Sequence, residues 1–523
     1  MNKYVTALTA ALGLIPIALD STIVNVAIVP ISKALHADIN TIQWIFLGYL
    51  LSNAAVVSLS GYLANRFGIK RLFILGLALF TGFSFLCGIA SSEGMLIGLR
   101  ALQGLGGGML IPLGMAIALQ PFAAEERARA NVVVGVPLLL APVLGPILGG
   151  VIIDNLNWQA IFFINIPFGA LAIALAWFVL PPDEVAAVDG QRHFDYLGLA
   201  LSTVGVVALI YAFKLVSQTR PHSATALQPL GAIYGWGYWE VWALAGGGLA
   251  LLVIFAVYSL RLRFEPVLDL RLFARYDFAI SNVVVWASSI VSFGVLFLIP
   301  VYLQEVRLPN LSALDTGIAL LPMGVAMMVG MVLSAGLYRK LGARIPVVLG
   351  AILFAVAFWQ LAGLTPATAS GDLWPWLTLV GLSFALTLMP TQTLALQALS
   401  GAVLNKATSL VNSSKLLWGS VGSAVLVTLF VEQSTSHWDQ LRGQLMRSLP
   451  GGALNLHDPR AVAVYRHVVA QAGTGGMTDV FKVLVYASVA LAVLGLALPG
   501  RRAAAEAQKA QAAASSEHAA TVA

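Results

Sequence analysis

The stretch Leu12-Gly-Leu-Ile-Pro-Ile-Ala-Leu-Asp20-Ser-Thr-Ile-Val-Asn25-Val-Ala-Ile-Val-Pro30 is apolar enough to cross a membrane as a helix, yet it contains an aspartate. At a rise of ~1.5 Å per residue, Asp20 lies roughly 22 Å along a helix that starts at Val5 and roughly 15 Å from its far end. A carboxylate at that depth costs about 2.5–3.5 kcal/mol, so a partner charge, a water-filled cavity or a proton must compensate it. Asp20 is therefore either a functional ionisable residue or a structural residue that pairs with a neighbouring helix.

The composition extends this membrane character to the whole chain. Of 523 residues, 59% are hydrophobic and 10% are charged, and the mean hydropathy is +0.87. These values exclude a soluble globular protein and predict an all-α polytopic membrane protein. The single Cys87 forms no cysteine metal site, and no histidine falls in a hydrophobic stretch, so we expect neither a metal nor a cofactor. The isolated charges also argue against a membrane-embedded enzyme.

Windows of about 20 apolar residues predict about 14 membrane spans. They cover residues 5–29, 41–63, 72–90, 95–119, 130–153, 161–180, 196–216, 241–260, 278–304, 316–337, 345–364, 374–394, 408–431 and 480–498. An even number of spans places both termini on one side. Most of the 29 Lys and Arg residues fall in loops on that side, so we expect cytoplasmic termini and a location in the cell (inner) membrane. The net charge of +6 thus reflects topology, and no nucleic-acid partner is needed.

A weak internal repeat suggests two duplicated halves. The segment 61–70, Gly-Tyr-Leu-Ala-Asn-Arg-Phe-Gly-Ile-Lys, pairs with the segment 335–344, Ala-Gly-Leu-Tyr-Arg-Lys-Leu-Gly-Ala-Arg. Secondary transporters are commonly built from such repeats, with the ligand at the interface. We predict an N-terminal six-helix half (1–180), two additional transmembrane helices with linkers (181–277) and a C-terminal six-helix half (278–500). The last half includes a long external loop (432–479) with an amphipathic helix near 461–470, and a cytoplasmic tail (501–523) follows.

Several stretches resemble one family. Residues 61–71 resemble the signature loop of the major facilitator superfamily, residues 99–108 its fourth-helix motif, and residues 135–150 the fifth-helix motif associated with antiporters. Residues 19–27 resemble the first-helix motif of the fourteen-span drug:proton antiporters of the EmrB/QacA type, and Trp158 followed by Ile161-Phe-Phe-Ile-Asn165-Ile-Pro167 is a further match. The resemblance implies the major facilitator fold, with two extra central helices, and proton-coupled export of amphipathic drugs or dyes by alternating access.

The resemblance also implies roles for individual residues. Asp20 takes and releases the coupling proton or meets a cationic substrate, and Arg100 modulates the affinity of that carboxylate for a proton. The depths of Asp20 and Arg100 in their spans allow a direct or water-mediated contact, although Arg100 bound only to backbone carbonyls is an alternative. We also predict that Gln103, Asn25 and Lys415 line the cavity. For Lys415 a snorkelling anchor is the competing interpretation, and a cavity position would bear on the sign of the substrate's charge.

A second set of residues is predicted to control conformation. It comprises Gly61, Asn65, Arg66, Gly68, Arg71, Pro142, Gly145, Pro146 and Gly149. Asn65 replaces an aspartate that is usual in the family, which implies that the lock of the outward-facing state is either weaker or replaced by hydrogen bonding. In the fifth span, small residues every four positions permit close helix packing, either for packing alone or to seal the path against proton leak. The glycines between 104 and 108 are likewise expected to pack helices rather than to bind phosphate.

The energy source and the partners complete the prediction. The chain has no Gly-x4-Gly-Lys-Ser/Thr motif for ATP, so the proton gradient is the expected energy source. The expected partners are a small-molecule substrate, protons and the lipid bilayer, with a periplasmic adaptor protein where the cell has an outer membrane. The alternatives are an exporter of a specific metabolite, antibiotic or siderophore, and a non-transporting sensor or assembly partner, which would not need an intramembrane Asp20 and Arg100.

Overall fold

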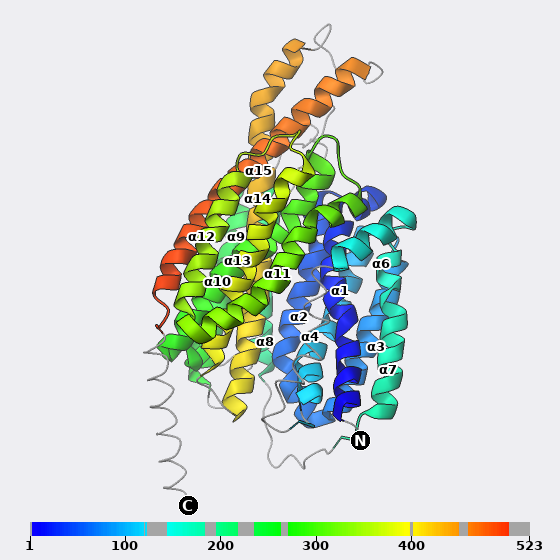
Figure 1. The fold of residues 1–523 in the computed structure, drawn as a ribbon, viewed down its shortest axis with the longest axis vertical. Coiled ribbons are helices and arrows are strands. Elements are labelled where there is room, and N and C mark those ends of the chain that lie inside the picture. Colours follow the sequence, from blue (N-terminus) through cyan, green and yellow to red (C-terminus); the bar gives the residue numbers. More distant parts are fainter. Residues whose placement is uncertain are drawn as a thin grey trace, which may run out of the picture.

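The computed structural model describes residues 3–119, 121–122, 144–183, 195–217, 235–262, 270–397, 401–448 and 459–500, and every regular element among them is helical (Figure 1). The helices are α1 (Lys3–Leu35), α2 (Ile39–Phe67), α3 (Ile69–Gly88), α4 (Glu93–Leu119), α6 (Ala160–Phe163), α7 (Asn165–Val179), α8 (Tyr196–Ser217), α9 (Trp239–Arg261), η2 (Leu270–Ala274), α10 (Tyr276–Val301), η3 (Tyr302–Val306), α11 (Ala313–Leu341), α12 (Arg344–Leu361), α13 (Ser370–Gln397), α14 (Gly401–Ser448) and α15 (Pro459–Leu496). In the described residues, 12 helices are long and apolar enough to cross a membrane, and Thr41–Val57 and Leu144–Asn155 are shorter apolar helices. The predicted all-helical membrane fold is confirmed.

The helices form two groups that meet along the middle of the molecule. The N-terminal group contains α1–α4, α6 and α7, the C-terminal group contains α10–α15, and each group packs mainly within itself. The two additional helices, α8 and α9, pack on each other, and α8 lies against α14 and α2. Thr428 on α14 donates a hydrogen bond to the carbonyl of Phe213 on α8 (2.9 Å). The chain starts at the lower end of Figure 1, and α15 ends there too.

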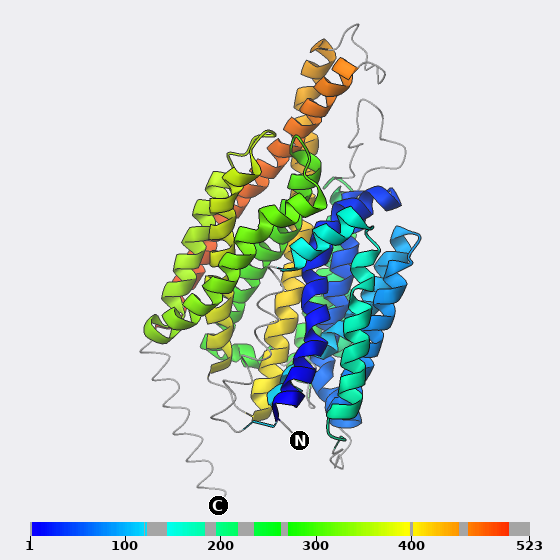
Figure 2. The same ribbon diagram turned by 45° about the vertical axis from the view of Figure 1, so that its right-hand side comes forward.

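The segment 432–479 differs from its prediction as a loop. Helix α14 continues to Ser448 and α15 already begins at Pro459, so the two helices form a hairpin above the bundle (Figure 2). Trp438, Leu445 and Val468 are buried in a small apolar cluster between them. The predicted helix at 461–470 is part of α15. Apolar residues at helical spacing in both arms of the hairpin explain why this segment is helical.

The two halves of the sequence repeat adopt the same local structure. Gly68 between α2 and α3 and Gly342 between α11 and α12 both have a positive φ, 92° and 77°, which favours glycine. Lys70 Nζ donates to the carbonyl of Leu180 at 2.7 Å, and Arg344 Nε donates to the carbonyl of Leu498 at 2.7 Å. In each repeat, therefore, the basic residue two positions after the glycine binds the end of that group's last helix.

An additional contact at the first repeat comes from a residue that the sequence did not single out. The carboxylate of Asp183, just after α7, accepts hydrogen bonds from the backbone N–H groups of Lys70 (2.7 Å) and Arg71 (3.1 Å). These two N–H groups belong to the first turn of α3, where no intrahelical acceptor exists. Asp183 therefore caps α3 and fixes the lower ends of α3 and α7 to each other.

We expect Asp183→Ala to destabilise the protein by about 1–2 kcal/mol, because two backbone donors lose a charged acceptor. The measurement is thermal unfolding of the purified protein in detergent. Asp439→Ala is the matched control, because Asp439 is an exposed carboxylate in the α14–α15 hairpin. Equal unfolding temperatures for the two variants would contradict the capping role.

Candidate functional site

The ion pair between Asp20 and Arg100 is the centre of the candidate site. Arg100 Nη1 lies 2.7 Å from Asp20 Oδ2, and the two side chains are 0% and 1% exposed, respectively. Asp20 lies on α1 and Arg100 on α4, so the pair joins two helices of the N-terminal group. Asp20 and Arg100 are therefore in direct contact, as their depths in the predicted spans allowed.

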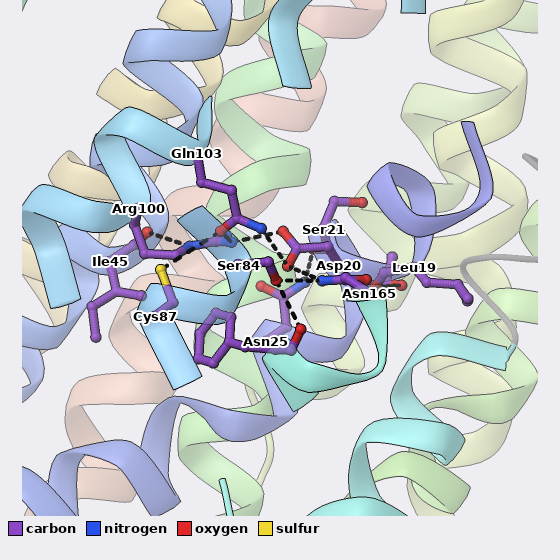
Figure 3. Close-up of polar contacts among 12 residues, drawn as sticks. Leu19, Asp20, Ser21, Asn25, Ile45, Ser84, Cys87, Arg100, Gln103 and Asn165 are labelled. Carbon is purple, nitrogen blue, oxygen red and sulfur yellow. Dashed lines mark hydrogen bonds and ion pairs between the residues drawn. The ribbon is translucent and has the colours of Figure 1, made fainter. Parts of the chain in front are cut away.

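Both oxygens of the carboxylate are occupied (Figure 3). Asp20 Oδ1 accepts from Asn165 Nδ2 at 3.1 Å and from Gln103 Nε2 at 3.4 Å. Asn165 in turn donates to Ser84 Oγ at 3.0 Å, and Ser84 donates to the carbonyl of Phe162 at 2.8 Å. The network thus connects α1, α3, α4 and the junction of α6 and α7.

The guanidinium group of Arg100 makes further contacts besides its ion pair with Asp20. Nη1 also donates to Gln103 Oε1 at 2.7 Å, Nε donates to the carbonyl of Ile45 at 3.4 Å, and the group lies 4.3 Å from the centre of the Tyr49 ring. Nη2 has no hydrogen-bond partner among the described residues. A buried donor without a partner is costly, so Arg100 has capacity for one further acceptor.

Glycines bring these helices close enough for the network to form. A Cβ at Gly108 would lie 3.0 Å from the Cα of Asn53 on α2, and one at Gly106 would lie 2.8 Å from the carbonyl oxygen of Gly76 on α3. These contacts involve backbone atoms, which cannot move aside. The predicted packing role of the glycines in α4 is confirmed.

The Leu144–Asn155 helix lies between the candidate site and the C-terminal group. A Cβ at Gly145 would overlap the side chain of Thr22 on α1, and one at Gly149 would lie 3.1 Å from the side chain of Ile23. On another face, a Cβ at Gly150 would lie 2.7 Å from the carbonyl oxygen of Ala313 on α11. Small residues therefore let this helix contact both α1, next to Asp20, and α11.

The two groups of helices are joined at the upper end by polar contacts. Lys33 Nζ lies 2.9 Å from Glu305 Oε1, and Gln304 Nε2 donates to the carbonyl of Val26 at 3.1 Å. The N–H of Leu314 donates to Asp154 Oδ2 at 2.8 Å. Together with the glycine contacts, these interactions close the upper end of the molecule.

The remaining predicted site residues lie elsewhere. Asn25 is buried on α1 and donates to the carbonyl of Ser21 at 3.2 Å, so no described contact connects it to Asp20. Lys415 is partly buried on α14, and Arg71 is exposed. Pro146 lies against Gly317 on α11. Pro142 and the tail 501–523 lie outside the described residues, and so do the surroundings of Gly61 and the side chains of Asn65 and Arg66.

Sequence reasoning missed three members of the network: Asn165, Ser84 and Tyr49. Asn165 stood in a stretch that resembled the family, but it was not assigned to the site. A polar side chain in an apolar span was the available signal, because such residues seek partners inside the membrane.

Comparison with known proteins identifies the class of this bundle. The family model of the Major Facilitator Superfamily matches residues 10–423, so the chain belongs to this superfamily of membrane transporters and is not an enzyme. It is similar to the Multidrug resistance protein B homolog of Mycobacterium tuberculosis, with 31% identity over 82% of this chain and 76% of the relative. It is also similar to the Multidrug export protein EmrB of Escherichia coli, with 30% identity over 86% of this chain and 82% of the relative. These relatives confirm the family resemblance of the sequence motifs.

A solved structure gives independent support for the fold. The chain is similar to a bacterial homologue of the human lysosomal transporter Spinster in an inward-facing, unoccupied conformation. The TM-score is 0.61, and the match covers 95% of this chain and 98% of the other at 15% identity. At that identity the likeness concerns the fold alone.

Proposed function

We propose that this transporter exports amphipathic drugs or dyes in exchange for protons, by alternating access. The buried pair of Asp20 and Arg100 is the observation that carries the proposal. In a membrane interior an ion pair is expensive and is retained where its charge is used. The relatives named as multidrug export proteins support the substrate class.

Proton binding would change this site in a defined way. A neutral Asp20 no longer attracts Arg100, whose guanidinium then depends on Gln103, the carbonyl of Ile45 and the unused capacity of Nη2. Because Asp20 is 1% exposed here, a proton reaches it only after a rearrangement of the surrounding helices. Protonation and conformation would therefore be coupled through the position of Arg100.

The proposed arrangement in the membrane follows the predicted topology. Two six-helix halves (1–180 and 278–500) flank the two additional helices, for a total of 14 spans, and both termini face the cytoplasm. The lower end of Figure 1 is then cytoplasmic and the α14–α15 hairpin is external. In this orientation, the closed upper end would correspond to a state that is shut toward the outside. The glycine-rich Leu144–Asn155 helix beside Asp20 would limit proton leak.

Efflux of ethidium from whole cells tests the proposal. Cells that express the chain should lose preloaded ethidium faster than control cells, and an uncoupler should remove the difference. Efflux that persists with the uncoupler would contradict proton coupling. If the well-folded protein moves neither ethidium nor the anionic dye fluorescein, export of drugs and dyes fails as the function, and a specific metabolite becomes the candidate substrate.

A further inference from the structure

Lys415 is a charged residue on the helix that joins the two groups. It lies in the lower part of α14, whose Ser423 accepts a hydrogen bond from Gln43 on α2 at 3.1 Å. Leu416 and Leu417, which follow Lys415, pack against the apolar core of the N-terminal group. Transporters built from two repeats hold their ligand at this kind of interface.

The ammonium group of Lys415 is not compensated by any group in the part of the chain that the structure describes. Among the described residues, no hydrogen bond or ion pair involves Lys415, which is partly buried. By contrast, Arg100, the intramembrane cation of the candidate site, is paired with Asp20. A charge inside a membrane requires water or a counter-ion. The interface between the groups therefore has an excess positive charge at Lys415.

A second donor without a partner among the described residues belongs to Trp286 on α10, which contacts α14 through Trp418. Trp418, three residues further on and 38% exposed, stacks on Trp286 of α10 with ring centres 5.4 Å apart. Residues three apart on a helix are neighbours on its surface. Trp286 Nε1 is buried and has no hydrogen-bond partner among the described residues. Lysine and indole N–H groups can only donate, and neither Lys415 nor Trp286 Nε1 finds an acceptor in the described ranges.

The geometry points to a ligand that brings a negative charge and an aromatic ring. Building on the proposed export function, we infer that Lys415 binds the anionic group of the transported molecule, and that the preferred substrates are aromatic organic anions such as aryl carboxylates or phenolates. Asp20 does not offer an alternative site for a cation in this state, because both its oxygens are occupied by Arg100, Gln103 and Asn165.

Equilibrium binding of two dyes with the same xanthene scaffold tests this inference. Fluorescein is an anion and rhodamine 6G is a cation, and binding of each to the purified protein is followed by fluorescence anisotropy. We expect wild type to bind fluorescein more tightly than rhodamine 6G. Lys415→Met should weaken fluorescein binding about 10-fold or more, as the loss of one charge-assisted hydrogen bond predicts, and leave rhodamine 6G unaffected. Lys415→Arg should retain fluorescein binding.

Lys482→Met is the matched control, because Lys482 is an exposed lysine that pairs with Asp479 on α15. This variant should bind both dyes as wild type does. The inference is overturned if wild type prefers rhodamine 6G, or if Lys415→Met leaves fluorescein binding unchanged, as a snorkelling anchor would. Because the assay needs no gradient, its result is independent of uncoupler-sensitive efflux. If efflux is driven by protons but the protein does not prefer the anionic dye, only the role of Lys415 is refuted and the proposed export function stands.

Discussion

Asp20→Asn is expected to abolish uncoupler-sensitive ethidium efflux, reducing it to the level of cells without the protein. The amide can still accept a hydrogen bond from Arg100, but it cannot bind and release a proton. Asp20 pairs with Arg100 at 2.7 Å and is almost fully buried. The described residues of the network include no other carboxylate that could replace it. The measurement compares efflux with and without an uncoupler at equal amounts of protein in the membrane.

The variant also leaves the guanidinium of Arg100 without its counter-ion, so its stability must be measured separately. Loss of one partner of a buried ion pair costs about 3–5 kcal/mol, and a lower unfolding temperature is expected. Asp20→Glu keeps the carboxylate and should retain part of the coupled efflux. Asp439→Asn, at an exposed carboxylate in the α14–α15 hairpin, is the control and should leave efflux unchanged. Undiminished uncoupler-sensitive efflux in Asp20→Asn would refute the role of Asp20.

The sequence was sufficient to find Asp20 and Arg100, because a charge in an apolar span is rare and costly wherever the helix lies. It was not sufficient to find Asn165 and Ser84. Small polar side chains are common in membrane helices, and their partners depend on how α1, α3 and α7 pack. The contact of Asp183 with the start of α3 joins residues more than 100 positions apart, so no local pattern predicts it.

The hairpin of α14 and α15 is a further feature that the sequence alone did not reveal. Its residues are too polar for a membrane span, and the segment 432–479 was therefore predicted to be mostly loop. Its helical structure depends on the pairing of two apolar stripes that include Trp438 and Val468, which are far apart in the sequence. By contrast, the turn glycines Gly68 and Gly342 could be aligned from the sequence, because a tight turn with positive φ restricts the residue itself.

Gly317→Leu is expected to prevent closure of the upper end and thereby to stop transport. Any Cβ at Gly317 would lie 2.8 Å from the carbonyl carbon of Pro146, and a backbone group at this distance must shift as a whole. A leucine side chain at this position therefore excludes the contact between α11 and the Leu144–Asn155 helix. Since alternating access needs the molecule to close at each end in turn, a variant that cannot close the upper end should not complete the cycle.

Distances between spin labels at Leu156 and Ser312 can report this closure, because both residues are exposed at the upper end, one on each side of the contact. Cys87 is the only cysteine and is buried, so a Cys87→Ala background permits specific labelling. We expect Gly317→Leu to lengthen the distance between the labels. Gly336→Leu on the same helix is the control, because a Cβ there meets nothing within 4 Å. An unchanged distance together with normal efflux in Gly317→Leu would show that the close approach of these helices is not needed for transport, whereas a longer distance with lost efflux would identify the contact as the external gate.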